Sequence, residues 1–98
     1  MIKLYKDQEL KELTDSVTFG IVRAGETKQV TTYLQNGYKG EIRDIKVVVE
    51  RSDVKILQQP KVLAKDAVGI VILEWSPKFD LEAGLNAKIG IKFDLLLS

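Results

Sequence analysis

The stretch that decides the fold is residues 84–98, which read GLNAKIGIKFDLLLS. From residue 85 to residue 95, apolar side chains stand at the odd positions, and polar residues or glycine stand between them. Successive side chains of a β-strand point to opposite faces of its sheet, so this pattern places one row in a core and the other in water. A helix would scatter the same residues around its circumference. The segment therefore predicts a long strand with one buried face.

Other segments carry a similar signal. Residues 29–35 and 44–50 alternate in the same way. Residues 67–75 (AVGIVILEW) are apolar on both faces and rich in β-branched side chains, which suits a strand buried on one side and partly covered on the other. Turn signals such as RAGET and QNGYKG separate these segments. Shorter candidate strands are IKLY, VTFGIV and VKIL, at residues 2–5, 17–22 and 54–57.

About seven short strands without a long helix predict an all-β fold, a sandwich of antiparallel strands in two sheets. A closed barrel is the alternative, but the chain is short for a barrel that encloses a cavity. The 98 residues are expected to form a single domain, 1–98. Residues 1–15 are expected to be an N-terminal arm, or a first strand followed by a short helical turn, because KDQELKELTD is the one stretch with helical character.

Composition argues against several classes of function. The chain has no cysteine and no histidine, which removes disulfides, thiolate zinc sites and the commonest general base. Its 15 Lys and Arg against 14 Asp and Glu give a net charge of +1, without the basic surplus that nucleic-acid binding needs. No signal peptide and no apolar run of membrane-spanning length is present. We therefore expect a protein that is not an enzyme, with no nucleic-acid or membrane partner.

Residues that could carry chemistry have simpler interpretations. Four carboxylates near the start would suit calcium, but they interleave with lysines and lack an acidic ligand loop, so a solvated face is favoured. Glu74 lies in an apolar run, yet no second acid is singled out to pair with it. The glycines match no phosphate-binding loop and are interpreted as turn residues. No catalytic, cofactor-binding or metal-ligating residue is predicted; the residues weighed are Asp7, Glu9, Glu12, Asp15, Gly20, Gly25, Gly37 and Gly40.

The aromatic residues allow two interpretations. Trp75, Tyr33, Tyr38, Tyr5 and Phe79 could form a stacking platform for a sugar or a base. The favoured interpretation is that Trp75 packs in the core at a strand end and that the tyrosines are half-buried in the sheets. Tyr38 and Phe79 lie in the expected turns, so they are the candidate contacts for a ligand bound by loops.

Some apolar residues stand at the wrong parity for a two-sheet core. Leu96 must point outward if Leu95 points inward, and Val48 and either Val71 or Ile72 raise the same question. Exposed apolar clusters commonly mark interfaces, so candidate partner contacts are Leu96, Val48 and Tyr33. The alternative is that barrel-like closure or the N-terminal strand covers this second row.

The order of several motifs resembles a known group of domains. The chain is similar to immunoglobulin-like domains of the major-sperm-protein-like and ciliary or centrosomal type, and to small immunoglobulin-like proteins of tailed bacteriophages. The likeness covers roughly residues 17–95, and it departs from the group at Arg23, where a proline is usual, and at Lys65-Asp66, where Pro-Gly is often seen. The motifs are Phe19-Gly20-Ile21-Val22, Ala24-Gly25-Glu26-Thr27-Lys28, Leu34-Gln35-Asn36, Pro60, Lys65-Asp66-Ala67, Trp75-Ser76-Pro77 and residues 85–93.

The resemblance implies an immunoglobulin-like β-sandwich that acts as an adhesive module without catalytic residues or cofactors. It implies a phage virion accessory that decorates a capsid or sits at the head–tail junction or tail surface. Its partner would be a capsid, tail or other virion protein, or a copy of itself. The expected location is the virion if the chain is phage-encoded, and otherwise the cytoplasm. The alternative is an adhesion module that recognises carbohydrate or a host surface through its loops.

Overall fold

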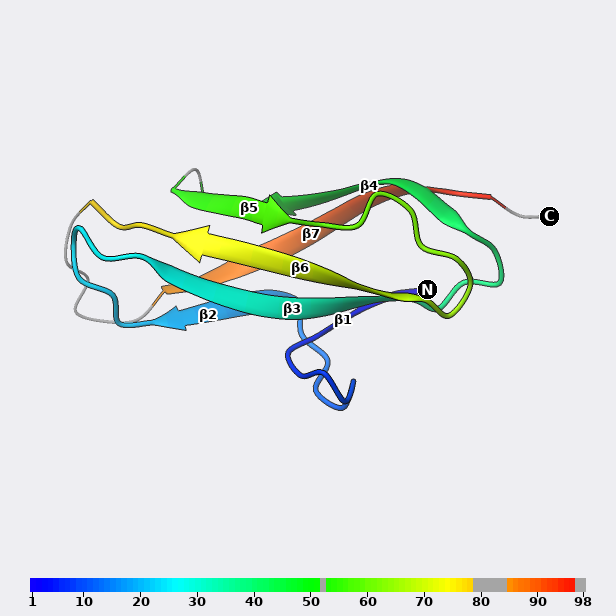
Figure 1. The fold of residues 1–98 in the computed structure, drawn as a ribbon, viewed down its shortest axis with the longest axis horizontal. Helices are drawn as coiled ribbons and strands as arrows, with labels where there is room; N and C mark the ends of the chain where they lie inside the picture. Colours follow the sequence, from blue (N-terminus) through cyan, green and yellow to red (C-terminus); the bar gives the residue numbers. More distant parts are fainter. Residues whose placement is uncertain (52, 79–84, 97–98) are drawn as a thin grey trace.

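The computed structural model describes residues 1–51, 53–78 and 85–96. These ranges contain strands and turns and no helix, so the prediction of an all-β fold is confirmed (Figure 1). The strands are β1 (Ile2–Tyr5), β2 (Ser16–Gly20), β3 (Lys28–Asn36), β4 (Ile42–Val49), β5 (Val54–Gln58), β6 (Val68–Trp75) and β7 (Leu85–Leu95).

The strands form two sheets, as a sandwich requires. One sheet has the order β1-β3-β6-β5 and the other the order β2-β7-β4, and all neighbours are antiparallel. Four strands facing three, in this order, match the division of an immunoglobulin constant-type sandwich. One position differs, because β2 lies beside β7 at the edge that the last strand fills in the immunoglobulin arrangement.

The first two strands belong to different sheets. β1 pairs with residues 33–36 of β3, and β2 pairs with residues 85–88 of β7. Residues 6–15 connect them as a turn, in which the Asp7 carboxylate accepts the N–H groups of Lys11 and Glu12 at 3.0 and 2.8 Å. Residues 1–15 thus give a first strand followed by a turn, and no helix forms in this turn. As a result, each of β3 and β7 is paired over only part of its length on this side.

The core lies between the inward faces of the two sheets. Trp75 is 0% exposed, and its ring lies 5.7 Å from that of Phe19, centroid to centroid. The prediction that Trp75 packs in the core is therefore confirmed. The other buried apolar residues include Leu4, Val17, Leu34, Ile42, Val47, Val71, Leu73, Leu85 and Ala87.

Two turns of the quoted motifs use left-handed backbone, and the second lies where the chain departs from the usual Pro-Gly. Gly25 adopts a φ of 85°, which glycine tolerates without steric cost. Asp66 adopts a φ of 63°, so an aspartate occupies the left-handed position that a glycine would fill in a Pro-Gly turn. The backbone turns here without the usual residue because Asp is among the few side chains that tolerate this conformation.

Candidate interaction surfaces

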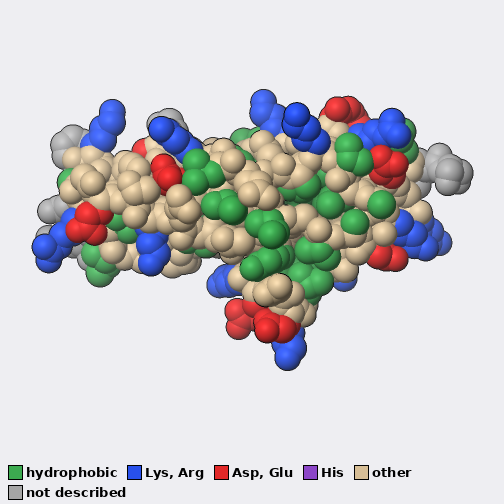
Figure 2. Space-filling model, in the orientation of Figure 1, with side chains coloured by type: hydrophobic (Ala, Val, Ile, Leu, Met, Phe, Trp, Pro, Cys, Tyr) green, Lys and Arg blue, Asp and Glu red, His purple; other side chains and the backbone are tan. Residues whose placement is uncertain are grey.

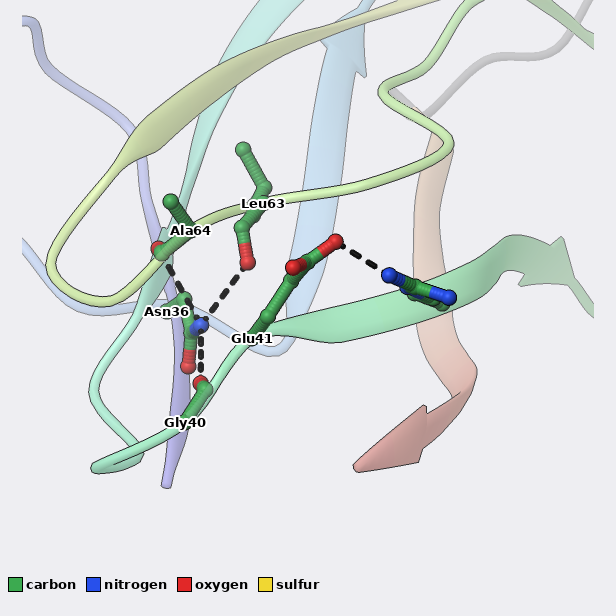
Figure 3. A network of polar contacts seen from close by, with 6 residues as sticks. Asn36, Gly40, Glu41, Leu63 and Ala64 are labelled. Atoms are coloured by element: carbon green, nitrogen blue, oxygen red, sulfur yellow. Dashed lines mark hydrogen bonds and ion pairs between the residues drawn. The ribbon is translucent and has the colours of Figure 1, made fainter. Parts of the chain in front are cut away.

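A polar network lies at the end of β3, where its hydrogen bonds hold two connections of the chain together (Figure 3). The Asn36 side chain is 0% exposed. Its amide Nδ2 donates to the carbonyl oxygens of Gly40, Leu63 and Ala64 at 2.9, 3.0 and 3.1 Å. Its Oδ1 accepts the N–H of Tyr38 at 2.9 Å. Asn36 therefore holds the β3–β4 connection against the segment before β6. The sequence did not predict this role, because Asn36-Gly37 indicates only a turn.

A second polar cluster lies beside the core tryptophan. Asp53 accepts hydrogen bonds from Arg51 at 2.8 and 2.9 Å and from the indole Nε1 of Trp75 at 2.9 Å. The Arg51 guanidinium, with the Trp75 N–H as a further donor, lowers the pKa of the Asp53 carboxyl well below its usual value. These contacts satisfy Asp53 within the fold, so we assign it a structural role.

The Asp53 cluster predicts a pH dependence of stability. Because its pKa is lower in the folded chain than the value of about 3.9 in the unfolded chain, the carboxylate stabilises the fold above about pH 4. This contribution is lost as the pH falls from about 4 toward the folded-state pKa. At pH 7, Asp53→Asn is expected to lower the free energy of unfolding by about 1 kcal/mol, measured by urea denaturation. The difference in stability between the two proteins should shrink progressively as the pH falls below about 4; a constant difference at every pH would contradict the assignment.

The three predicted partner contacts do not form one surface. Val48 lies opposite Gly90 in the β4–β7 ladder, on the outer face of the three-stranded sheet, and Leu96 follows β7 at a position of the same parity. Tyr33 lies in β3 opposite Tyr5 and Ile70, on the outer face of the four-stranded sheet. The two groups therefore face away from each other across the sandwich.

The outer face of the four-stranded sheet carries the broader apolar surface. The register places Tyr5, Tyr33 and Ile70 in one row across β1, β3 and β6. Val68 and Ile70 are each 43% exposed, and Leu57 of β5 is 48% exposed. Figure 2 looks onto this sheet, and hydrophobic side chains gather across its middle. We call this surface, made by Tyr33, Val68 and Ile70, the apolar outer face.

Of the two candidate loop contacts, Tyr38 and Phe79, the structure describes Tyr38. The Tyr38 ring packs on that of Phe93 with centroids 5.5 Å apart, and Tyr38 is half-buried against the core cluster. Phe79 lies outside the described residues. Within the described ranges no group of three or more acidic residues is placed to hold a metal ion. No helix there is long and apolar enough to cross a membrane.

A small hollow opens where the chain crosses from one sheet to the other. Its volume is about 120 Å³, and it is lined by Lys6, residues 16–18 of β2 and residues 30–32 of β3. Among the described residues, Lys6 is the one charged side chain that lines it, and no acidic side chain does. It therefore offers neither a catalytic pair nor a ligand-sized cavity.

Comparisons with known proteins identify no relative. No family model, no curated protein and no solved structure matches the chain.

Proposed function

We propose that this protein is a non-enzymatic structural protein that attaches to a larger protein assembly through the apolar outer face. The observation that carries the proposal is the exposure of Val68 and Ile70, beside Tyr33, together on one sheet face. Contiguous apolar surface of this kind is costly to leave in water and commonly marks a protein interface. The polar clusters of Asn36 and Asp53 are occupied by contacts within the fold, so they support no competing site.

The assembly that we propose is a phage virion, with the protein as a capsid decoration or as a head–tail or tail surface subunit. This part rests on the resemblance of the motifs to small immunoglobulin-like phage proteins. Attachment in many copies fits a modest interface, since weak identical contacts sum to firm binding when they are linked.

The test is affinity capture of the tagged protein from its native source, with mass spectrometry of the bound proteins. Two matched variants carry the same change on opposite outer faces: Ile70→Glu on the four-stranded sheet and Val48→Glu on the three-stranded sheet. A buried charge at an interface costs several kcal/mol, so Ile70→Glu is expected to reduce capture of structural virion proteins at least tenfold. Val48→Glu should leave capture near that of the parent.

Three outcomes would contradict parts of the proposal. Loss of capture with Val48→Glu alone would place the interface on the surface of Val48 and Leu96. Recovery of no other protein by the parent would contradict attachment to an assembly. Recovery of a non-virion assembly would retain attachment but overturn the virion assignment.

A further inference from the structure

The second half of β7 has an open edge. β2 pairs with residues 85–88, and the N–H of Ile89 makes the last bond on that side, to the carbonyl oxygen of Asp15 at 2.8 Å. On its other side, β7 stays paired with β4 as far as Leu95. In the part of the chain that the structure describes, no strand continues β2 along residues 90–95.

The direction of the free backbone groups follows from two hydrogen bonds. The N–H of Ile89 points toward β2, whereas the N–H of Leu96 points toward the β4 side, to Glu41 at 2.9 Å. Backbone groups of a strand alternate between its two sides, so Ile91, Phe93 and Leu95 direct their N–H and C=O groups to the open edge. Their three donors and three acceptors are therefore the ladder positions that a further strand would fill.

Burial changes at the point where β2 ends. Along the inward face of β7, Leu85 and Ala87 are buried, but Ile89, Ile91, Phe93 and Leu95 are only half-buried. All of these residues belong to the regular alternation, and the half-buried ones pack against the core from one side. A strand laid beside residues 90–95 would cover this apolar row and complete its burial.

The outer face of the same edge carries two charges, Lys92 and Asp94, and in the described part of the chain neither forms an ion pair with its neighbour on β4. Lys92 lies directly opposite Lys46 in the β4–β7 ladder, and like charges in this position are destabilising. Asp94 lies opposite Arg43, whose guanidinium is bonded to Glu41 at 3.1 Å. An acidic residue beside Lys92 and a basic residue beside Asp94 would therefore be favoured across the open edge.

We propose that the open edge of β7 accepts an extended segment of a partner protein as an added antiparallel strand. Read from its N-terminus, the segment has the pattern apolar–basic–apolar–acidic–apolar. Its apolar residues lie opposite Leu95, Phe93 and Ile91, and its charges lie opposite Asp94 and Lys92. Main-chain hydrogen bonds supply affinity and the alternate side chains supply specificity, as in other cases of strand addition. This site is separate from the apolar outer face, and its test does not depend on that face.

The probe is the capped peptide TVKVEVT, with TVEVKVT, in which the two charges are exchanged, as the matched control. Titration of the isotope-labelled protein is followed by the amide chemical shifts. TVKVEVT is expected to shift the amides of Ile91, Phe93 and Leu95 with a Kd of roughly 0.1–1 mM, the range of a short peptide that must be ordered on binding. TVEVKVT is expected to bind roughly two- to fivefold more weakly, because each charged pair contributes only modestly.

Two variants test the geometry of the edge. Lys92→Glu, on the exposed face, should remove the preference between the two peptides without affecting the fold, because each peptide then has one favourable and one unfavourable charged pair. Ile91→Pro removes an N–H that faces the open edge and leaves the bonds to β4 in place, so it should abolish binding. If Ile91→Pro fails to fold, the loss of peptide preference in Lys92→Glu still decides the result.

The contradicting outcomes are distinct. No shift with either peptide at about 1 mM, equal binding of both peptides to the parent, or an undiminished preference for TVKVEVT in Lys92→Glu would overturn the proposal. Shifts confined to Tyr33 and Ile70 would place the peptide on the apolar outer face instead. Shifts of Ile91, Phe93 and Leu95 that depend on protein concentration, without peptide, would assign the edge to a second copy of the chain. None of these results decides the capture experiment on Ile70 and Val48.

Discussion

Asn36→Ala is expected to lower the free energy of unfolding by about 3–4 kcal/mol, close to half the stability of a domain of modest stability. The change leaves the carbonyl oxygens of Gly40 and Ala64 without the amide that now bonds them, and it leaves the N–H of Tyr38 without its acceptor. Water cannot replace these bonds cheaply, because Asn36 is fully buried. The melting temperature should fall by roughly 12–30 °C, measured by circular dichroism.

Two further variants distinguish this network from a general packing effect. Asn36→Asp keeps the shape of the side chain but replaces the donor with a carboxylate oxygen that faces the same carbonyl oxygens, so it should destabilise at least as much as alanine. Asn86 is exposed, and its side chain makes one hydrogen bond, to Thr18. Asn86→Ala should therefore cost less than about 1 kcal/mol. Near-parental stability of Asn36→Asp would contradict the assigned role.

Trp75→Ala is expected to cost about 3–5 kcal/mol, measured by urea denaturation followed by circular dichroism, because the variant loses its one tryptophan fluorophore. Trp75 is fully buried at the end of β6 and packs against Phe19 of β2, which links the two sheets. Its removal would open a cavity between them and would deprive Asp53 of a hydrogen bond.

Two substitutions of Trp75 separate the contribution of its ring packing from that of its hydrogen bond to Asp53. Trp75→Phe keeps a ring beside Phe19 and removes the indole N–H, so it should cost about half as much as alanine or less. Tyr33→Ala, which removes an aromatic ring from the outer sheet face, should cost less than either. An equal loss for Trp75→Phe and Trp75→Ala would mean that the bond to Asp53, and not the packing, dominates.

The strands were predictable because their alternation is local. Residues 85–95 and 29–35 follow the period of two, and the structure places strands at both. The candidate strand at 17–22 ends earlier than expected, because Gly20 adopts a φ of 73° and Ile21 turns out to solvent. Residues 6–15 carry a helical pattern, but the Asp7 carboxylate closes a turn there and no helix forms.

The surfaces were less predictable because they depend on register between distant segments. Leu96 and Val48 were identified from parity, but parity alone does not tell that Tyr33 belongs to the opposite face. The role of Asn36 depends on carbonyl groups at residues 63 and 64, which no local pattern connects to it. The open edge of β7 likewise follows from where β2 stops pairing, which the alternation of β7 does not reveal.

The most direct measurement is hydrogen exchange of the individual β7 amides in the isolated protein. Within the described residues, the backbone groups at the open edge of β7 have no partner strand, so the exchange rates of its amides should alternate along the strand. The amides of Lys92, Asp94 and Leu96 face β4 and should exchange slowly, and that of Ile89 should also be protected by its bond to Asp15. The amides of Ile91, Phe93 and Leu95 should exchange much faster. Equal protection along residues 89–96 would mean that the edge is already closed, and would contradict the account.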